Sequence, residues 1–250
     1  MNFLSVDQYK LELIKDYEYD NIIILKISDD DFKRIPEKIF KFKNLEELHF
    51  FDNMISYISP EIKKLSKLTK LSLSYNNIIA LPIEISTLNN LTQLWLSHNG
   101  LTKIPSEIGK LTNLKYLDLD SNNLEILPDE ITNLSNLHEL YLSNNRLTML
   151  PEKIGKLTKL HKLIIYNNKL TKLTPEIKKI KNIYIDITSY DNLDNLSNDC
   201  TYLHIYNLGH ILHNLPASLM EIQLYHPIIK EKDIKLPYNC KLFINDKEII

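Results

Sequence analysis

The sequence predicts an α/β solenoid, with a parallel β-sheet on its concave side and short helices or 3₁₀ turns on its convex side. One observation is a pattern of apolar residues that returns every 23 residues, as in LTQLWLSHNGLTKIPSEIGKLTN from Leu91 and LKYLDLDSNNLEILPDEITNLSN from Leu114. Another is the fixed place of an asparagine and a proline in that pattern, such as Asn99 and Pro105. Self-similarity at a period of about 20 to 50 residues indicates stacked units that share one core.

Composition excludes several classes of partner. The chain has 250 residues and a formal net charge of −2, from 30 basic and 32 acidic residues. That balance gives no bulk attraction to nucleic acid or to an anionic membrane. The sequence has no apolar run of the roughly 18 residues that a spanning helix needs, and its first 20 residues do not read as a secretory signal. We therefore expect a soluble cytoplasmic protein without nucleic-acid or membrane contacts.

Two cysteines, Cys200 and Cys240, are too few for a secreted disulfide scaffold. They precede predicted strands two coils apart, which places them roughly 10 Å from each other and beyond disulfide reach.

Residues 1–21 lie before the repeats. Their apolar side chains are spaced for one face of a helix, at Phe3, Leu4, Val6, Tyr9, Leu13 and Tyr17. Because the end of a stack exposes an apolar coil, we predict that this segment is a helical N-terminal cap.

Seven repeats of 23 residues follow, from 22 to 182. Each begins L-x-x-L-x-L, an alternation that predicts a strand with one buried face. An inward asparagine comes next, and its amide can satisfy backbone groups that a tight corner leaves unpaired. Repeated from coil to coil, these side chains predict a hydrogen-bonded ladder, which comprises Asn53, Asn76, Asn99, Asn122, Asn145 and Asn168, with Asp30 in the first copy.

The second half of each repeat reads L-P-x-x-I-x-x-L. The prolines suit the first position of a short helix, at Pro36, Pro82, Pro105, Pro128 and Pro151. Pro60 and Pro175 come one place later, behind Ser59 and Thr174, and predict a shifted start. Glutamates then fall in the first helical turn, at Glu84, Glu107, Glu130 and Glu152.

After residue 182 the period shortens. Strand-like cores recur at 183–187, 202–206, 221–225 and 241–244, with spacings near 19 to 20 residues. We predict that residues 183–250 continue the same solenoid in shorter, degenerate coils and end in a C-terminal cap.

The repeat L-x-x-L-x-L-x-x-N-x-L-x-x-L-P-x-x-I-x-x-L resembles that of leucine-rich repeat proteins, and its 23-residue form resembles their intracellular Ras-group class. The segments LPASLMEIQL and LPYNCKLFI are similar to FNIP-type repeats, which abound in slime moulds and giant viruses of amoebae. The signature F-N-x-P-I is absent there, and the nearest text is LYHPI at 224–228. The resemblance implies a horseshoe whose concave sheet binds protein, in the host cytoplasm if the source is viral.

The outward strand positions between the leucines predict the binding surface. The central column contains Lys26, His49, Ser72, Trp95, Asp118, Tyr141 and Ile164. Aromatic side chains dominate interface energetics, and we expect an exposed Trp95 at the centre. The alternative is that Tyr, Trp and Thr only favour strands and stack on neighbouring rungs. We predict a partner-binding set of His49, Phe51, Tyr75, Trp95, His98, Tyr116, Asp118, Asp120, Tyr141 and Tyr166.

Catalytic and metal-binding patterns are weak. Asp118 and Asp120 project from one strand face about 7 Å apart, but an open sheet lacks the cleft that would separate their pKa values. His138 and His161 share a column on adjacent rungs without a third ligand of clear spacing. We therefore predict no enzyme activity, metal or cofactor, and a monomer that binds an unidentified protein. A second hypothesis is a structural or regulatory scaffold that uses its lateral face or C-terminal coils, including for self-association.

Overall fold

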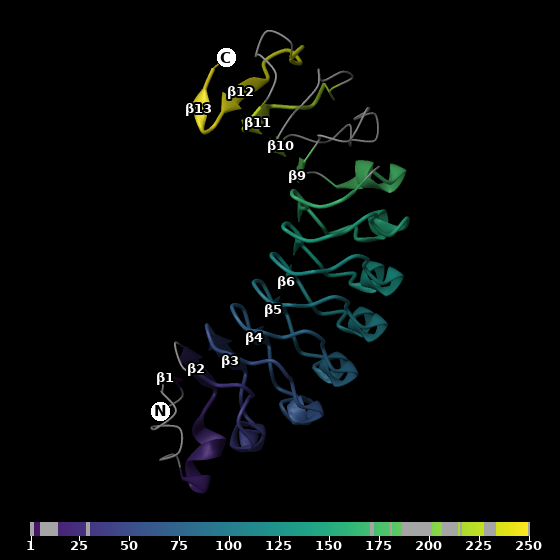
Figure 1. Cartoon of the computed structure of the whole chain (residues 1–250). Coiled ribbons are helices and arrows are strands. Elements are labelled where there is room, and N and C mark those ends of the chain that lie inside the picture. Colours follow the sequence, from purple (N-terminus) through teal and green to yellow (C-terminus); the bar gives the residue numbers. More distant parts are fainter. Residues whose placement is uncertain are drawn as a thin grey trace.

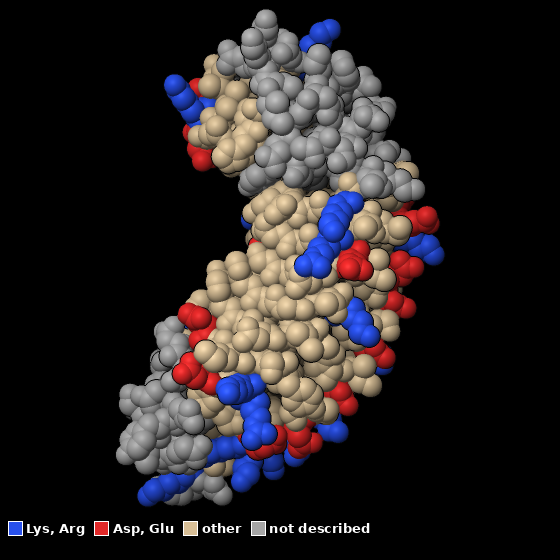
Figure 2. Space-filling view, viewed as in Figure 1, with Lys and Arg blue, Asp and Glu red and all other residues tan. Residues whose placement is uncertain are grey.

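The computed structural model describes residues 3–5, 15–28, 31–170, 173–180, 182–186, 202–206, 215, 217–227 and 234–249. These residues form an arc, with the strands along its inner edge and the 3₁₀ helices along its outer edge (Figure 1). In the same view, charged side chains of both signs gather along the outer edge, and the flank of the central coils is mostly uncharged (Figure 2). No described helix has the length and apolar character needed to cross a membrane.

One sheet joins the 13 described strands in chain order, and every pair is parallel except β12 with β13. The predicted solenoid with a concave parallel sheet is confirmed. The strands are β1 (Phe3–Ser5), β2 (Ile24–Ser28), β3 (Glu47–Phe51), β4 (Lys70–Ser72), β5 (Gln93–Trp95), β6 (Tyr116–Asp118), β7 (Glu139–Tyr141), β8 (Lys162–Ile164), β9 (Asn182–Asp186), β10 (Tyr202–Tyr206), β11 (Glu221–Tyr225), β12 (Lys241–Ile244) and β13 (Lys247–Glu248).

The outer edge consists of short 3₁₀ helices. They are η1 (Asp16–Asn21), η2 (Glu37–Lys41), η3 (Pro60–Lys64), η4 (Ile83–Thr87), η5 (Ser106–Lys110), η6 (Asp129–Asn133), η7 (Ile154–Lys156) and η8 (Pro175–Lys179).

The core is a single apolar cluster that runs through the described coils. Leu71, Leu94 and Leu117 pair with one another across β4, β5 and β6, and each is fully buried. Leu91 and Leu96 flank Leu94 and are also fully buried, as the L-x-x-L-x-L pattern predicts. Because no single coil could bury these side chains, neighbouring coils stabilise one another.

The asparagine ladder is present. The Asn99 amide nitrogen donates to the carbonyls of Leu73 at 2.9 Å and Leu96 at 3.1 Å, and its oxygen accepts from the Ile78 amide at 2.9 Å. The same three kinds of bond recur at Asn76, Asn122, Asn145 and Asn168. At Asn53 the side-chain oxygen has no partner among the described residues, and Asp30 lies outside them.

Four of the helices begin one residue after their proline, rather than at the proline as predicted. Pro36, Pro82, Pro105 and Pro128 are N-caps with extended backbones rather than first helical residues. Their carbonyls accept the first helical bond, as in Ile108 N to Pro105 O at 3.0 Å, and this role keeps them outside the helix.

Two helices start in the predicted shifted way. Pro60 and Pro175 occupy the first helical position, where Ser59 and Thr174 cap the amides of the following glutamates at 3.3 and 3.4 Å. In the coil of η7, the helix begins only at Ile154. The predictions that Pro151 starts this helix and that Glu152 lies in its first turn are therefore wrong.

The two ends differ in how well the sequence predicted them. Phe3–Ser5 pairs as strand β1 with β2, so a helix is wrong there, and residues 6–14 lie outside the described part of the chain. The predicted C-terminal strands are present at β9 to β12, with β9 one residue earlier than expected. Cys200 also lies outside the described residues, whereas Cys240 is a buried free thiol. The domain limits at 21 and 182 stay a prediction.

Candidate partner-binding face

The sheet register places the predicted central column on successive strands. Lys26, His49, Ser72, Trp95, Asp118, Tyr141 and Ile164 pair in that order from β2 to β8. The column continues through Tyr184, His204, Gln223 and Phe243 on β9 to β12. The sequence prediction missed these four residues because it stopped where the 23-residue period ended. The alternation inside each later strand core was the available signal.

Aromatic rings contact one another in two rows along the concave face. In the first row the ring centroids of His49 and Trp95 are 6.3 Å apart, those of Trp95 and Tyr116 are 5.4 Å apart, and those of Tyr116 and Tyr141 are 5.0 Å apart. These distances are typical of favourable ring pairs. Trp95 is half-buried rather than exposed, because His49 and Tyr116 pack on either side of it.

The second row begins at the last residue of β3 and continues just past the ends of β4 and β5. Phe51 and Tyr75 have ring centroids 5.1 Å apart, and His98 stacks on Tyr75 at 4.1 Å. Tyr75 and His98 are in turns with φ values of 56° and 52°, not in strands as the sequence suggested. Other described residues at this turn position are Asp52, Ser121, Asn144 and Asn167, with short polar side chains, and His226 in a later coil. A tyrosine in this left-handed backbone region is unusual, whereas histidine is among the residue types enriched there.

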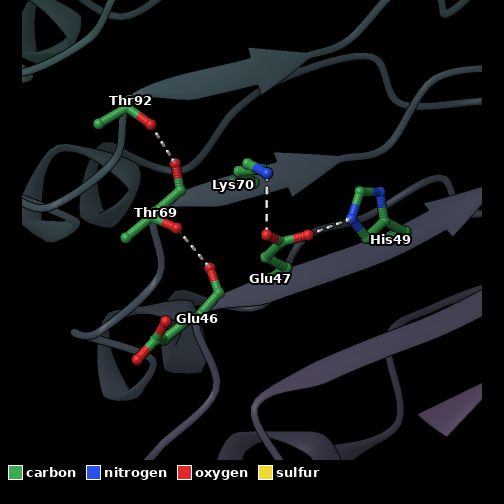
Figure 3. A network of polar contacts seen from close by, with 6 residues as sticks. All are labelled: Glu46, Glu47, His49, Thr69, Lys70 and Thr92. Atoms are coloured by element: carbon green, nitrogen blue, oxygen red, sulfur yellow. Dashed lines mark hydrogen bonds and ion pairs between the residues drawn. The ribbon is translucent and has the colours of Figure 1, made fainter. Parts of the chain in front are cut away.

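At one end of the face, the charge of Glu47 is paired with neighbouring side chains (Figure 3). Glu47 on β3 contacts Lys70 Nζ at 2.9 Å and His49 Nε2 at 3.4 Å. Burial raises the pKa of Glu47, but the bonds with Lys70 and His49 together outweigh it, and the pKa lies below its usual value. Beside them, the Thr69 and Thr92 hydroxyls donate to carbonyls of the preceding coils at 3.1 and 3.0 Å.

Glu139 on β7 is also paired. It accepts from the Tyr141 hydroxyl at 2.5 Å and lies 3.9 Å from Lys162 Nζ. Burial, and then this hydrogen bond, raise the pKa of Tyr141, so its phenol stays protonated at neutral pH.

Asp118 and Asp120 lie between these two paired regions. The amide of Asp120 donates to Asp118 Oδ1 at 3.0 Å, and Asp120 Oδ2 accepts from Ser121 Oγ at 2.8 Å and Asn144 Nδ2 at 3.2 Å. Burial raises the pKa of Asp118, against the opposing effect of the Asp120 amide. Within the described part of the chain, neither carboxylate forms a salt bridge.

Two hollows open on the concave face. The tryptophan hollow, of about 260 Å³, is lined by His49, Phe51, Ser72, Ser74, Tyr75, Trp95, Ser97 and Asp118. The tyrosine hollow, of about 370 Å³, is lined by Tyr75, Ser97, His98, Tyr116, Asp118, Asp120, Tyr141, Ile164, Tyr166 and Tyr184. All ten residues of the predicted set line one hollow or the other, so the structure brings them together. That they bind a partner stays a prediction.

The histidine pair from the sequence lies directly before strands β7 and β8. The rings of His138 and His161 meet edge to face with centroids 5.7 Å apart. The described residues contain no group of three side chains that could hold a metal ion.

A third hollow, of about 720 Å³, lies between η6 and η7 on the outer side. Ile126 and Met149 contribute apolar surface to it and are 59% and 56% exposed. The sequence analysis did not identify these residues.

Three family models match the sequence. They are described as a leucine-rich repeat region, over residues 103–198, leucine-rich repeats in two copies, over 43–88, and a leucine-rich repeat, over 90–111. A comparison with curated protein sequences gives no match.

Two solved structures share the fold. A leucine-rich repeat protein of Leptospira interrogans superposes with a TM-score of 0.76 at 24% identity, over 97% of this chain and 71% of that one. An internalin of Listeria monocytogenes gives 0.59 at 18% identity, over 93% and 85%. Such low identities show the fold alone. Together with the stacked coils, buried leucines and asparagine ladder, these matches show that the chain is a leucine-rich repeat protein.

Proposed function

We propose that this protein is a non-enzymatic interaction module that binds another protein on its concave face. Support comes from the two rows of rings and the two hollows between them. Aromatic side chains in a partly desolvated concave surface are the usual anchors of protein interfaces.

The observation that carries the proposal is the position of Tyr75, on which His98 stacks. Strand preference explains Trp95, Tyr116 and Tyr141, which lie in strands. It does not explain a tyrosine in a turn with positive φ, where the other described coils use Asp, Ser, Asn or His. Tyr75 also remains 45% exposed, so folding does not account for it. Binding does.

The location and subclass are part of the same proposal. The near-neutral charge and the 23-residue LP repeat support a cytoplasmic protein of the intracellular class. The LPxSL segments near the C-terminus support a relation to FNIP-type repeats and, for a viral source, residence in host cytoplasm.

Partner capture tests the concave face. Wild-type protein and a Trp95→Ala, Tyr141→Ala double variant are used to recover partners from lysate of the source cells. We expect the double variant to bind the partner at least about thirtyfold more weakly, as for loss of a hot spot of about 2 kcal/mol. Ile126→Ala with Met149→Ala, on the outer side, is the matched control. Retention by the concave variant and loss by this control would contradict the proposal.

A second candidate function is a scaffold that associates through its outer side. The exposed Ile126 and Met149 beside the large hollow favour it, because contiguous exposed apolar surface marks interaction sites. Sedimentation velocity over a range of concentrations tests self-association. A monomer at the highest concentration would exclude that form of the scaffold.

A further inference from the structure

The tyrosine hollow combines ring faces with two carboxylates. Asp118 and Asp120 lie among its lining residues, and Tyr75 with His98 forms a stacked pair on one side. On another side, Tyr116 and Tyr141 have ring centroids 5.0 Å apart. Rings and carboxylates both attract cations, the rings through their negative faces.

Among the residues that the structure describes, the charge pattern of the face leaves these two carboxylates without a salt bridge. Glu47 has Lys70 and Glu139 has Lys162, at 2.9 and 3.9 Å. Among the described residues, the hydrogen bonds to Asp118 and Asp120 come from neutral donors, namely a backbone amide, hydroxyls and the Asn144 amide. The imidazole of His98 lies near Asp118, and a positive charge on this ring stabilises the ionised form of the Asp118 carboxyl group.

The chain itself shows that a cation fits these rings. Lys162 Nζ lies 5.1 Å from the ring centre of Tyr141 and 5.6 Å from that of Tyr184, and both rings line the hollow. Distances below about 6 Å are those of favourable cation–π contacts. A cation supplied by a partner would find ring faces there as well. It would also find the carboxylates of Asp118 and Asp120, which form no salt bridge with the described residues.

We propose that the tyrosine hollow binds the guanidinium group of an arginine side chain presented by the protein partner, an inference that rests on the proposed function. Arginine fits better than lysine because its planar group stacks on rings while its five N–H donors reach carboxylates at its edge. The ammonium of lysine is more strongly hydrated and has no flat face. Asp118 is half-buried, so a cation would replace solvation that the carboxylate has lost.

The test is a titration of the full chain with N-acetyl-arginine methylamide, followed by NMR shifts of the Asp118 and Asp120 amides. We expect saturable shifts with a dissociation constant on the order of millimolar for so small a ligand. The citrulline analogue, which is the uncharged isostere, and the lysine analogue should each bind at least about tenfold more weakly. Asp118→Asn with Asp120→Asn should abolish the shifts, while Glu125→Gln, an exposed acid elsewhere, should leave them unchanged.

The asparagine variants can keep the local hydrogen bonds, because an amide oxygen accepts as a carboxylate does. Absence of saturable shifts, equal binding of either analogue, or full binding by the double variant would overturn the inference. A partner that needs Trp95 and Tyr141 but not Asp118 and Asp120 would overturn it too, and would leave the proposed function standing. A partner that needs none of the four would instead overturn the proposed function.

Discussion

The imidazole ring of His98 stacks on the ring of Tyr75, with 4.1 Å between the centroids and 15° between the planes. Both residues have positive φ, so one aromatic contact joins two strained turns in neighbouring coils. Left-handed backbone costs roughly 1–2 kcal/mol for an ordinary side chain. A ring pair is worth about 0.5–1.5 kcal/mol, so the contact offsets only part of that cost.

Substitutions at Tyr75 test this strain. Tyr75→Asn should leave the free energy of unfolding within about 1 kcal/mol of wild type, because Asn tolerates the left-handed conformation. Asn144 has φ 53° at the same turn position. Tyr75→Val should lower the free energy of unfolding by about 2 kcal/mol or more, since β-branched residues tolerate it worst. Urea denaturation measures both, and equal losses would contradict the strain.

The asparagine ladder should be the most sensitive polar feature of the fold. Asn99→Ala would leave the Ile78 amide without its partner, and the Leu73 and Leu96 carbonyls would each keep one ladder donor, from Asn76 and Asn122. We expect a loss of about 1–3 kcal/mol in the free energy of unfolding, as for one unsatisfied buried group. Asn136→Ala is the control, because its amide donates to a carbonyl in an exposed contact, and it should cost less than about 1 kcal/mol. Similar losses in urea titrations would show that the ladder carries no special stability.

Substitution by alanine should lower the free energy of unfolding at one of two glycines with negative φ and change it little at the other. A Cβ at Gly109 would lie 2.4 Å from the Glu130 carbonyl oxygen in the next coil, whereas at Gly100 its nearest neighbour would be 3.4 Å away. Gly109→Ala should therefore lower the free energy of unfolding by about 1–3 kcal/mol through overpacking. Gly100→Ala should change it by less than about 1 kcal/mol. Thermal unfolding of the two variants decides, and a stable Gly109→Ala would mean that the coils can separate at little cost.

The sequence predicted the elements whose cause is local and repeated. Leu94 and Asn99 recur at a fixed period, so strand, core and ladder followed from pattern alone. It failed where a single coil departs from the pattern. Helix η7 starts late although Pro151 and Glu152 keep their places, and Phe3–Ser5 pairs with β2 although its apolar spacing is helical.

The lining of the two hollows was predictable from the sequence, but its geometry was not. Column positions gave the ten residues, because the register of parallel strands repeats the sequence period. The half-burial of Trp95 depends on ring contacts between coils, which one repeat does not encode. The positive φ of Tyr75 recurs in neighbouring coils, but no glycine marks that turn position in the sequence. The salt bridges of Glu47 with Lys70 and of Glu139 with Lys162, which occupy two lysines in the described part of the chain, are also contacts between strands.

His204 should make stability fall in mild acid. Burial, and then the charge of Lys162, lower its pKa to about 4 from the ordinary 6.5, against the opposing charge of Asp246. Between these values the unfolded chain binds the proton and the folded chain does not. The contribution of neutral His204 to stability is therefore full above pH 6.5 and is lost as the pH falls to about 4. His204→Gln should flatten this part of the profile, and an NMR titration of the imidazole that gave a value near 6.5 would contradict it.

Asp118 should make stability depend on pH in the opposite direction, so that stability falls as the pH rises. Burial raises its pKa above the ordinary 3.8, helped by the charge of Asp120 and opposed by the Asp120 amide, Ser97 and His98. The folded chain then holds the proton to higher pH than the unfolded chain, so stability is highest below pH 3.8 and declines as the pH rises through the raised pKa.

Asp118→Asn removes this ionisation. We expect the variant to unfold at a higher temperature than wild type at pH 7, with the difference vanishing near pH 3. Glu125→Gln, at an exposed position, should show no such pH-dependent difference. A less stable variant at pH 7 would mean that the carboxylate supports the fold. A more stable variant that no longer binds N-acetyl-arginine methylamide would mean that the chain keeps a charge which weakens its fold, because that charge receives the partner's guanidinium.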